Sequence, residues 1–241
     1  MTAVDREQLR VLCPDTAIPQ YLFPNMSTVL LDYCILDRPR RLAHFFAQVM
    51  HETHGLTSLR DHFDYSAERI VALWPRRFPD LREALPFAHN PVGLANKLYR
   101  KRLGNRESGD GWWFIGRGLI RITGRAMYER VGEAIGADLV RNPDLVLTPT
   151  YALPAACEVW RAADGNALAD RNDVNALTRA IKGVSEGLAS RSKWLAKTRE
   201  VWPQEHQRQR RGGPISPRAH VSCGDYSRVW SSCTERSHQM R

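Results

Sequence analysis

Glu52 and Asp61 are the residues whose types and spacing most directly predict chemistry. Glu52 lies in the run His51-Glu52-Thr53-His54-Gly55, at the end of an apolar helical pattern, and Asp61 follows nine positions later. Glycoside hydrolysis uses two carboxyl groups, one to protonate the leaving oxygen and the other to activate water or attack the sugar. The pair therefore predicts cleavage of a polysaccharide.

An aromatic, Gly-rich loop follows at Gly111-Trp112-Trp113-Phe114-Ile115-Gly116-Arg117-Gly118. Aromatic side chains stack on the faces of sugar rings, and equally often they fill a core. We expect one of the three aromatic residues to face a substrate cleft and the other two to pack inside. Trp112 and Trp113 are the candidates for contact with sugar.

The position of Glu52 at a helix end predicts a raised pKa. Backbone carbonyls carry partial negative charge there and disfavour ionisation, and apolar neighbours would remove water. A general acid working near neutral pH needs such a shift. The alternatives are a solvated surface Glu52 and an Asp61 that serves as a loop acid paired with Arg60 or as a helix cap, a role for which Asp64 competes.

The histidines on either side of Glu52 raise the alternative of a zinc-dependent hydrolase. The zinc motif H-E-x-x-H needs histidines four positions apart, whereas His51 and His54 are three apart. We therefore predict that the protein uses no metal and no cofactor.

Composition predicts a soluble globular protein. The 241 residues are 43% hydrophobic and 25% charged, and no apolar run approaches the roughly 20 residues that span a bilayer. The net charge of +9 suits an acidic cell wall, while the absence of a Lys/Arg stripe on a helix face argues against nucleic acid. The N-terminus does not read as a secretory signal, so we expect a monomer kept in the cytoplasm until it is released.

The organisation predicted along the chain is mainly helical, because apolar residues repeat at helical spacing and are followed by caps and stops. A loop is expected over 105–118 and a short extended piece over 119–123. Residues 204–241 are rich in Arg, Gln, Ser and Gly and predict a disordered tail, with residues 1–203 as the folded domain. Helices are expected over 38–50, 66–74, 90–104, 125–135, 149–163, 173–182 and 185–201.

Five ordered segments, within a match from roughly Pro14 to Trp202, resemble glycoside hydrolase family 19, the group of chitinases and phage-type endolysins. They are Phe46–Thr53; Leu59–Asp61 with Tyr65–Ala67; Gly116–Gly124; Asn142–Leu145 with Leu177–Gly183; and Gly187–Arg191.

The resemblance implies a two-lobed, mainly helical, lysozyme-like fold with a substrate cleft and at most a small β element. It implies an endo-acting, inverting enzyme on β-1,4-linked polymers containing N-acetylglucosamine, either peptidoglycan or chitin. A prophage endolysin would also need a separate membrane-permeabilising partner. The implied roles are general acid for Glu52, base for Asp61, water binding for Thr123, electrostatic support for Arg191, and substrate binding for Tyr65, Trp112, Trp113, Arg121 and Lys182.

The chain departs from the family pattern at four positions. Asp61 stands where the family has Glu, Arg121 where it has Gln, and Met127 and Lys182 where it has Asn. The Asp61 side chain reaches about 1.5 Å less far than a Glu side chain would. At the other three positions side-chain amides are replaced by the cations Arg121 and Lys182 and by the thioether of Met127. The cations suit a substrate that bears carboxylates, and the shortened acid leaves a catalytically weakened carbohydrate-binding relative as the alternative.

Overall fold

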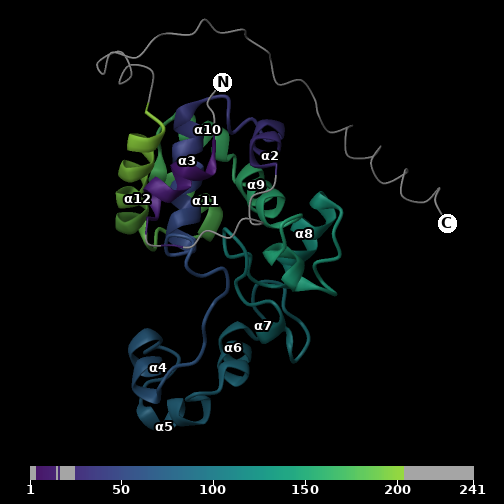
Figure 1. The fold of residues 1–241 in the computed structure, drawn as a ribbon. Coiled ribbons are helices and arrows are strands. Elements are labelled where there is room, and N and C mark those ends of the chain that lie inside the picture. The colour runs from purple at the N-terminus through teal and green to yellow at the C-terminus, as the bar shows by residue number, and fades with distance from the viewer. Residues whose placement is uncertain (1–3, 15, 17–24, 204–241) are drawn as a thin grey trace, which may run out of the picture.

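The computed structural model describes residues 4–14, 16 and 25–203, and these residues are folded mostly into helices (Figure 1). No strand forms among them, and the predicted extended piece over 119–123 is reduced to an isolated bridge between Arg117 and Ile122, beside a second between Arg60 and Arg117. In the same part of the chain no helix has both the length and the apolar character needed to cross a membrane. The tail predicted from residue 204 lies outside the described residues.

The larger lobe is built around a core of buried aliphatic and aromatic side chains. Its helices come from both halves of the chain (Figure 1). They are α1 (Arg6–Leu12), α2 (Met26–Asp32), α3 (Pro39–Glu52), α8 (Arg125–Ile135), η2 (Pro143–Leu147), α9 (Ala152–Ala162), α10 (Gly165–Asp170), α11 (Val174–Lys182) and α12 (Leu188–Val201).

The smaller lobe has its own apolar cluster, centred on Ile70, Phe78 and Leu94. Figure 1 shows its helices set apart from the larger lobe, which confirms the predicted two-lobed arrangement. They are α4 (Ala67–Leu73), α5 (Leu81–Ala84), η1 (Leu85–Phe87) and α6 (Pro91–Tyr99), with α7 (Asp110–Trp113) packed beside α6.

Helix α3 forms the centre of the larger lobe. The sequence predicts one buried face, but the structure buries the helix on almost every side. The reason is that Ala43 and Ala47 are small enough for α12 to pack closely through Leu195, while Phe45 packs edge-on against Trp160. The catalytic candidate Glu52 is thus the last residue of a helix that is buried over most of its length.

Local sequence signals place several helix ends correctly. Ser66 caps α4 by accepting a hydrogen bond from the Arg69 amide, whereas Asp64, the other candidate cap, pairs with His89. Helix α6 ends at Tyr99, five residues before the expected stop at Gly104. The predicted loop over 105–118 contains the single helical turn α7. The helices α1, α2, α5 and α10 were not predicted, because each has no more than seven residues and too few positions to show a period.

Candidate active site

The Glu52 carboxylate is buried between two cations. Its side chain is 8% exposed; Oε1 accepts a hydrogen bond from Arg191, and Oε2 lies 3.3 Å from Lys182 Nζ. Burial opposes ionisation, but Lys182 and Arg191 outweigh it and lower the pKa of Glu52. The expectation of a raised pKa is therefore wrong for the unliganded protein. Both partners lie on helices far along the chain, and a local pattern could not show them.

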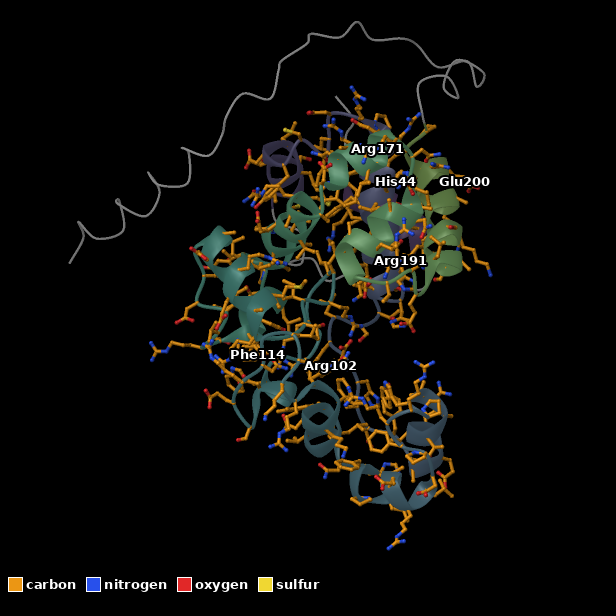
Figure 2. All side chains as sticks on the ribbon, turned by 180° about the vertical axis from the view of Figure 1, so that it is seen from behind. His44, Arg102, Phe114, Arg171, Arg191 and Glu200 are labelled. Carbon is orange, nitrogen blue, oxygen red and sulfur yellow. The ribbon has the colours of Figure 1, made fainter. Side chains whose placement is uncertain are left out.

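Arg191 is itself held by α3. Its guanidinium donates to Glu52 and also to Gln48, one turn earlier on the same helix, and the side chain is 1% exposed. Figure 2 shows Arg191 within the larger lobe. A neighbouring contact joins His51 Nδ1 to the Ser190 hydroxyl at 2.9 Å, so α3 and the first turn of α12 are tied twice. Sequence reasoning missed Gln48, although its spacing of four from Glu52 was a usable signal.

Asp61 lies on the segment that leads from α3 to the smaller lobe, and both of its carboxylate oxygens accept hydrogen bonds. Oδ1 is 2.8 Å from Arg121 Nη1, and Oδ2 is 3.1 Å from the Gly116 amide nitrogen. Burial raises the pKa of Asp61, and Arg121, Lys182 and the Gly116 amide only partly oppose the shift. Arg60 instead pairs with Asp144, so Asp61 is not the Arg60-paired loop acid of the alternative reading.

Gly116 is required where Asp61 packs against it. A Cβ added at Gly116 would stand 2.3 Å from Asp61 Oδ2. Only glycine permits this close approach, and the Asp61 amide completes it by donating to the Gly116 carbonyl at 2.8 Å. The loop flanking the second acid is thus shaped around its carboxylate.

The residues predicted to bind sugar differ in their surroundings. Tyr65 packs edge-on against His62 and Trp74, and the Asp61 charge contributes, after burial, to raising the pKa of Tyr65. Trp112 packs partly buried against the smaller lobe's cluster. Trp113 is 47% exposed and donates from Nε1 to the Val140 carbonyl.

The loop's third aromatic residue, Phe114, is fully buried in the larger lobe's core. Among the three aromatic residues, Trp113 is therefore the most exposed, and Trp112 is half-buried. Thr123 is half-buried, and its hydroxyl donates to the Arg121 carbonyl at 2.9 Å.

Arg121 brings the two acids to one place. It donates from Nε to the Glu52 backbone carbonyl at 2.9 Å and from Nη1 to the Asp61 carboxylate at 2.8 Å. The charge of Lys182 also acts on both carboxylates. The structure therefore assembles Glu52, Asp61, Arg121, Lys182 and Arg191 into one cluster.

Two other features lie apart from this cluster. Among the described residues, no three His, Cys, Asp or Glu side chains come together in a way that could hold a metal ion. A pocket of about 570 Å³ lies between α1 and α12, lined by Asp5, Gln8, Val11, Lys197 and Glu200 among others, and it includes none of the predicted site residues.

Comparison with known proteins identifies the family. A family model for glycoside hydrolase family 19, described as chitinase class I, matches residues 95–175, a stretch that includes Arg121 and Thr123 but neither acid. A glycosyl hydrolase family 19 domain-containing protein of Haemophilus influenzae is 33% identical over 153 residues, which are 63% of this chain and 74% of that protein. The acidic 27 kDa endochitinase of Solanum lycopersicum is 35% identical over 145 residues, but these span only 44% of its length and 60% of this chain.

Solved structures agree on the fold. A bacterial family 19 chitinase superposes with a TM-score of 0.56 at 19% identity, covering 89% of this chain and 99% of the other. This likeness confirms the predicted mainly helical, lysozyme-like fold. The family follows from the Haemophilus influenzae match, which covers 74% of that protein at 33% identity: the chain belongs to glycoside hydrolase family 19, a family of glycosidases.

Proposed function

We propose that the protein hydrolyses β-1,4 bonds in cell-wall polymers containing N-acetylglucosamine, by an endo-acting, inverting acid/base mechanism. The observation that carries the proposal is that one guanidinium, that of Arg121, contacts both the Glu52 backbone and the Asp61 carboxylate. The two acids are thereby brought close together, which suits a reaction in which one carboxyl group protonates the glycosidic oxygen and the other accepts a proton from water.

Asp61 is the base in this mechanism. Each of its oxygens accepts one hydrogen bond in the structure, which leaves lone pairs to accept a proton from water. Thr123 already uses its hydroxyl hydrogen on the Arg121 carbonyl, so its oxygen is left as an acceptor that can hold this water. In an inverting enzyme the two carboxyl groups stand about 6.5–9.5 Å apart, with the water between the base and the sugar.

Glu52 is the general acid, and it must gain a proton before it can act. In the structure Lys182 and Arg191 favour its ionised form. The Lys182 side chain is 30% exposed, whereas Arg191 is buried, so an incoming substrate can displace Lys182 alone. Losing that cation raises the pKa of Glu52 and favours protonation as the bond to be cleaved arrives.

We favour peptidoglycan over chitin as the substrate. Peptidoglycan bears carboxylates, and Lys182 is a partly exposed cation beside the proposed acid. The net charge of +9 also suits an acidic wall. The cellular role would be that of a prophage endolysin, acting as a monomer and held in the cytoplasm until a separate membrane-permeabilising partner releases it. The Solanum lycopersicum relative is named an endochitinase, so a chitinase is the other outcome to be tested.

Turnover on purified walls and on soluble chitooligosaccharides tests the proposal, with Glu52→Gln as the inactive variant. The amide keeps the shape but cannot donate the proton, so the rate should fall by at least about a hundredfold. Glu68→Gln, an exposed acid of the smaller lobe, is the matched control and should leave the rate unchanged. Wall lysis by Glu52→Gln within tenfold of wild type would remove Glu52 from the mechanism.

A carbohydrate-binding relative with weakened catalysis is the second candidate. The observation that favours it is that both carboxylates are paired with cations, and that the base is the shorter Asp61. Wild-type protein that sediments with walls but releases no new reducing ends would decide for binding without turnover.

A further inference from the structure

Most of the N–H groups of the Arg121 guanidinium donate hydrogen bonds to other residues of the protein. Besides the bonds to Glu52 and Asp61, its Nη2 donates to the Ser58 carbonyl at 2.9 Å and to the Ser58 hydroxyl at 3.1 Å. These four bonds occupy four of the five N–H donors of a guanidinium. The side chain is 6% exposed, so little of it is accessible to a sugar.

The backbone at Arg121 is in a conformation that non-glycine residues seldom adopt. Its φ is +54°, in the left-handed region. Such a conformation is unfavourable for a residue with a Cβ and persists only where the surroundings determine it. The flanking contacts do so: the Arg121 amide donates to the Gly118 carbonyl, and the Gly118 amide donates to the Leu59 carbonyl. The loop is therefore tied to the segment that carries Asp61.

The Arg121 guanidinium joins three residues from two different parts of the chain. Glu52 ends the buried helix α3, whereas Ser58 and Asp61 lie on the segment that leaves it. A planar guanidinium fixes direction as well as distance, since its N–H groups are held in a rigid plane. From the other side, the Gly116 amide holds the second oxygen of Asp61. The carboxylate is thus clamped between Arg121 and Gly116.

We propose that Arg121 is a positioning residue, which holds the Asp61 carboxylate at a fixed place relative to the end of α3 and so sets the geometry of the two acids. The inference rests on the proposed function. It replaces the expectation that Arg121 binds substrate, because the side chain is buried and occupied by the protein. It also gives the shorter acid at position 61 a partner that compensates for its lost reach.

Arg121 supplies charge as well as geometry. Burial raises the pKa of Asp61, and Arg121 is the largest opposing influence. A base must be ionised to accept a proton from water, so activity is lost as pH falls through the pKa of that base. Removing the guanidinium charge raises this pKa further and must move the acidic limb of the pH–rate profile to higher pH.

The test compares Arg121→Gln with Arg60→Gln. We expect Arg121→Gln to lower kcat by about a hundredfold, as a misplacement near 1 Å can do, with KM changed less than about threefold and the acidic limb moved to higher pH. Arg60→Gln removes an arginine next to Asp61 in sequence that pairs with Asp144, and it should leave both parameters near wild type. A raised KM with kcat retained would mean that Arg121 binds sugar, and an unmoved acidic limb would also overturn the inference.

Arg121→Lys keeps the experiment decisive if the Gln variant does not fold, as judged by its cooperative thermal transition. Lysine retains a charge but cannot span three groups. We expect the acidic limb to stay near that of wild type while kcat falls, and an unchanged kcat would contradict positioning. Wild type without turnover on walls and chitooligosaccharides would overturn the proposed function and the inference with it. An active wild type whose Arg121 variants behave like wild type would overturn the inference alone.

Discussion

Lys182 Nζ lies 3.3 Å from Glu52 Oε2, although 130 positions separate the two residues in the chain. Helix α11 ends at this lysine and helix α3 ends at this glutamate, so two helix C-termini meet at the site. A cation at such a meeting point offsets the partial negative charge of both helix ends. The contact has measurable consequences for pH dependence.

Lys182→Gln should move the alkaline limb of the pH profile of kcat/KM to higher pH, because this parameter reports the pKa values of the enzyme before substrate displaces Lys182. Lys182 lowers the pKa of Glu52, and a general acid is lost from the active form as pH rises through its pKa. Without the cation the pKa of Glu52 rises, so the protonated acid persists to higher pH. Lys182→Arg keeps the charge and is the control, with an unmoved limb. A Gln variant with an unmoved limb would show that Glu52 is not the titrating acid.

Gly116→Ala should lower kcat by about a hundredfold, because the new methyl group would displace the Asp61 carboxylate. The matched control is Gly109→Ala in the same loop, where an added Cβ would meet no atom within 4 Å and φ is −93°. Thermal unfolding of both variants separates misfolding from misplacement. Equal rates for the two variants would show that the position of Asp61 does not limit turnover.

Several elements of this fold follow from local chemistry. Helix α8 has the predicted bounds, 125–135, and Ser66 caps α4 because its side chain can reach an orphan amide of the first turn. The site follows only in part, because its electrostatics depend on residues distant in sequence. The residues next to Glu52 in sequence do not indicate its contacts with Lys182 and Arg191. Those next to Arg121 do not indicate that its guanidinium bonds to Glu52, Ser58 and Asp61. A left-handed backbone at an arginine has no compositional signal of the kind that glycine supplies.

Acid should destabilise the fold through His44. This side chain is fully buried, and Figure 2 shows it farther from the smaller lobe than Arg191. Burial lowers its pKa to about 4, while the unfolded value is about 6.5. The unfolded state therefore binds more protons between these values. The stability that neutral His44 contributes is complete above pH 6.5 and is lost as pH falls toward 4.

The expected loss from His44 alone is roughly 2 kcal/mol between pH 7.5 and pH 5, measured by denaturant unfolding. His51, whose pKa burial also lowers to about 4, adds to the same slope. His44→Gln should flatten the slope, and His54→Asn, which replaces an exposed histidine in the left-handed region, should not. A wild-type stability that is level over this range would contradict the assignment.

The fold should tolerate removal of residues 204–241 but not loss of Trp202. That indole is 1% exposed, stacks on Phe46 with ring centroids 5.0 Å apart, and donates to Gln8. A chain ending at Pro203 keeps these contacts and should unfold cooperatively near the wild-type temperature. Trp202→Ala should cost about 3–5 kcal/mol. A shortened chain without a cooperative transition would show that the predicted tail is part of the fold.

The placement of the two acids also bears on how the protein could be redesigned. Glu52 ends a helix that is packed on almost every side, so most substitutions on α3 would disturb folding before they could improve catalysis. Asp61, Gly116 and Arg121 lie on connecting segments and belong to neither apolar cluster themselves, although core residues such as Phe63 and Ile120 lie close to them in sequence. Combinatorial libraries aimed at new polymer specificity should therefore diversify the exposed residues of 56–66 and 99–124 around the fixed Asp61–Arg121–Gly116 unit, and leave α3 and the buried residues of these segments as they stand.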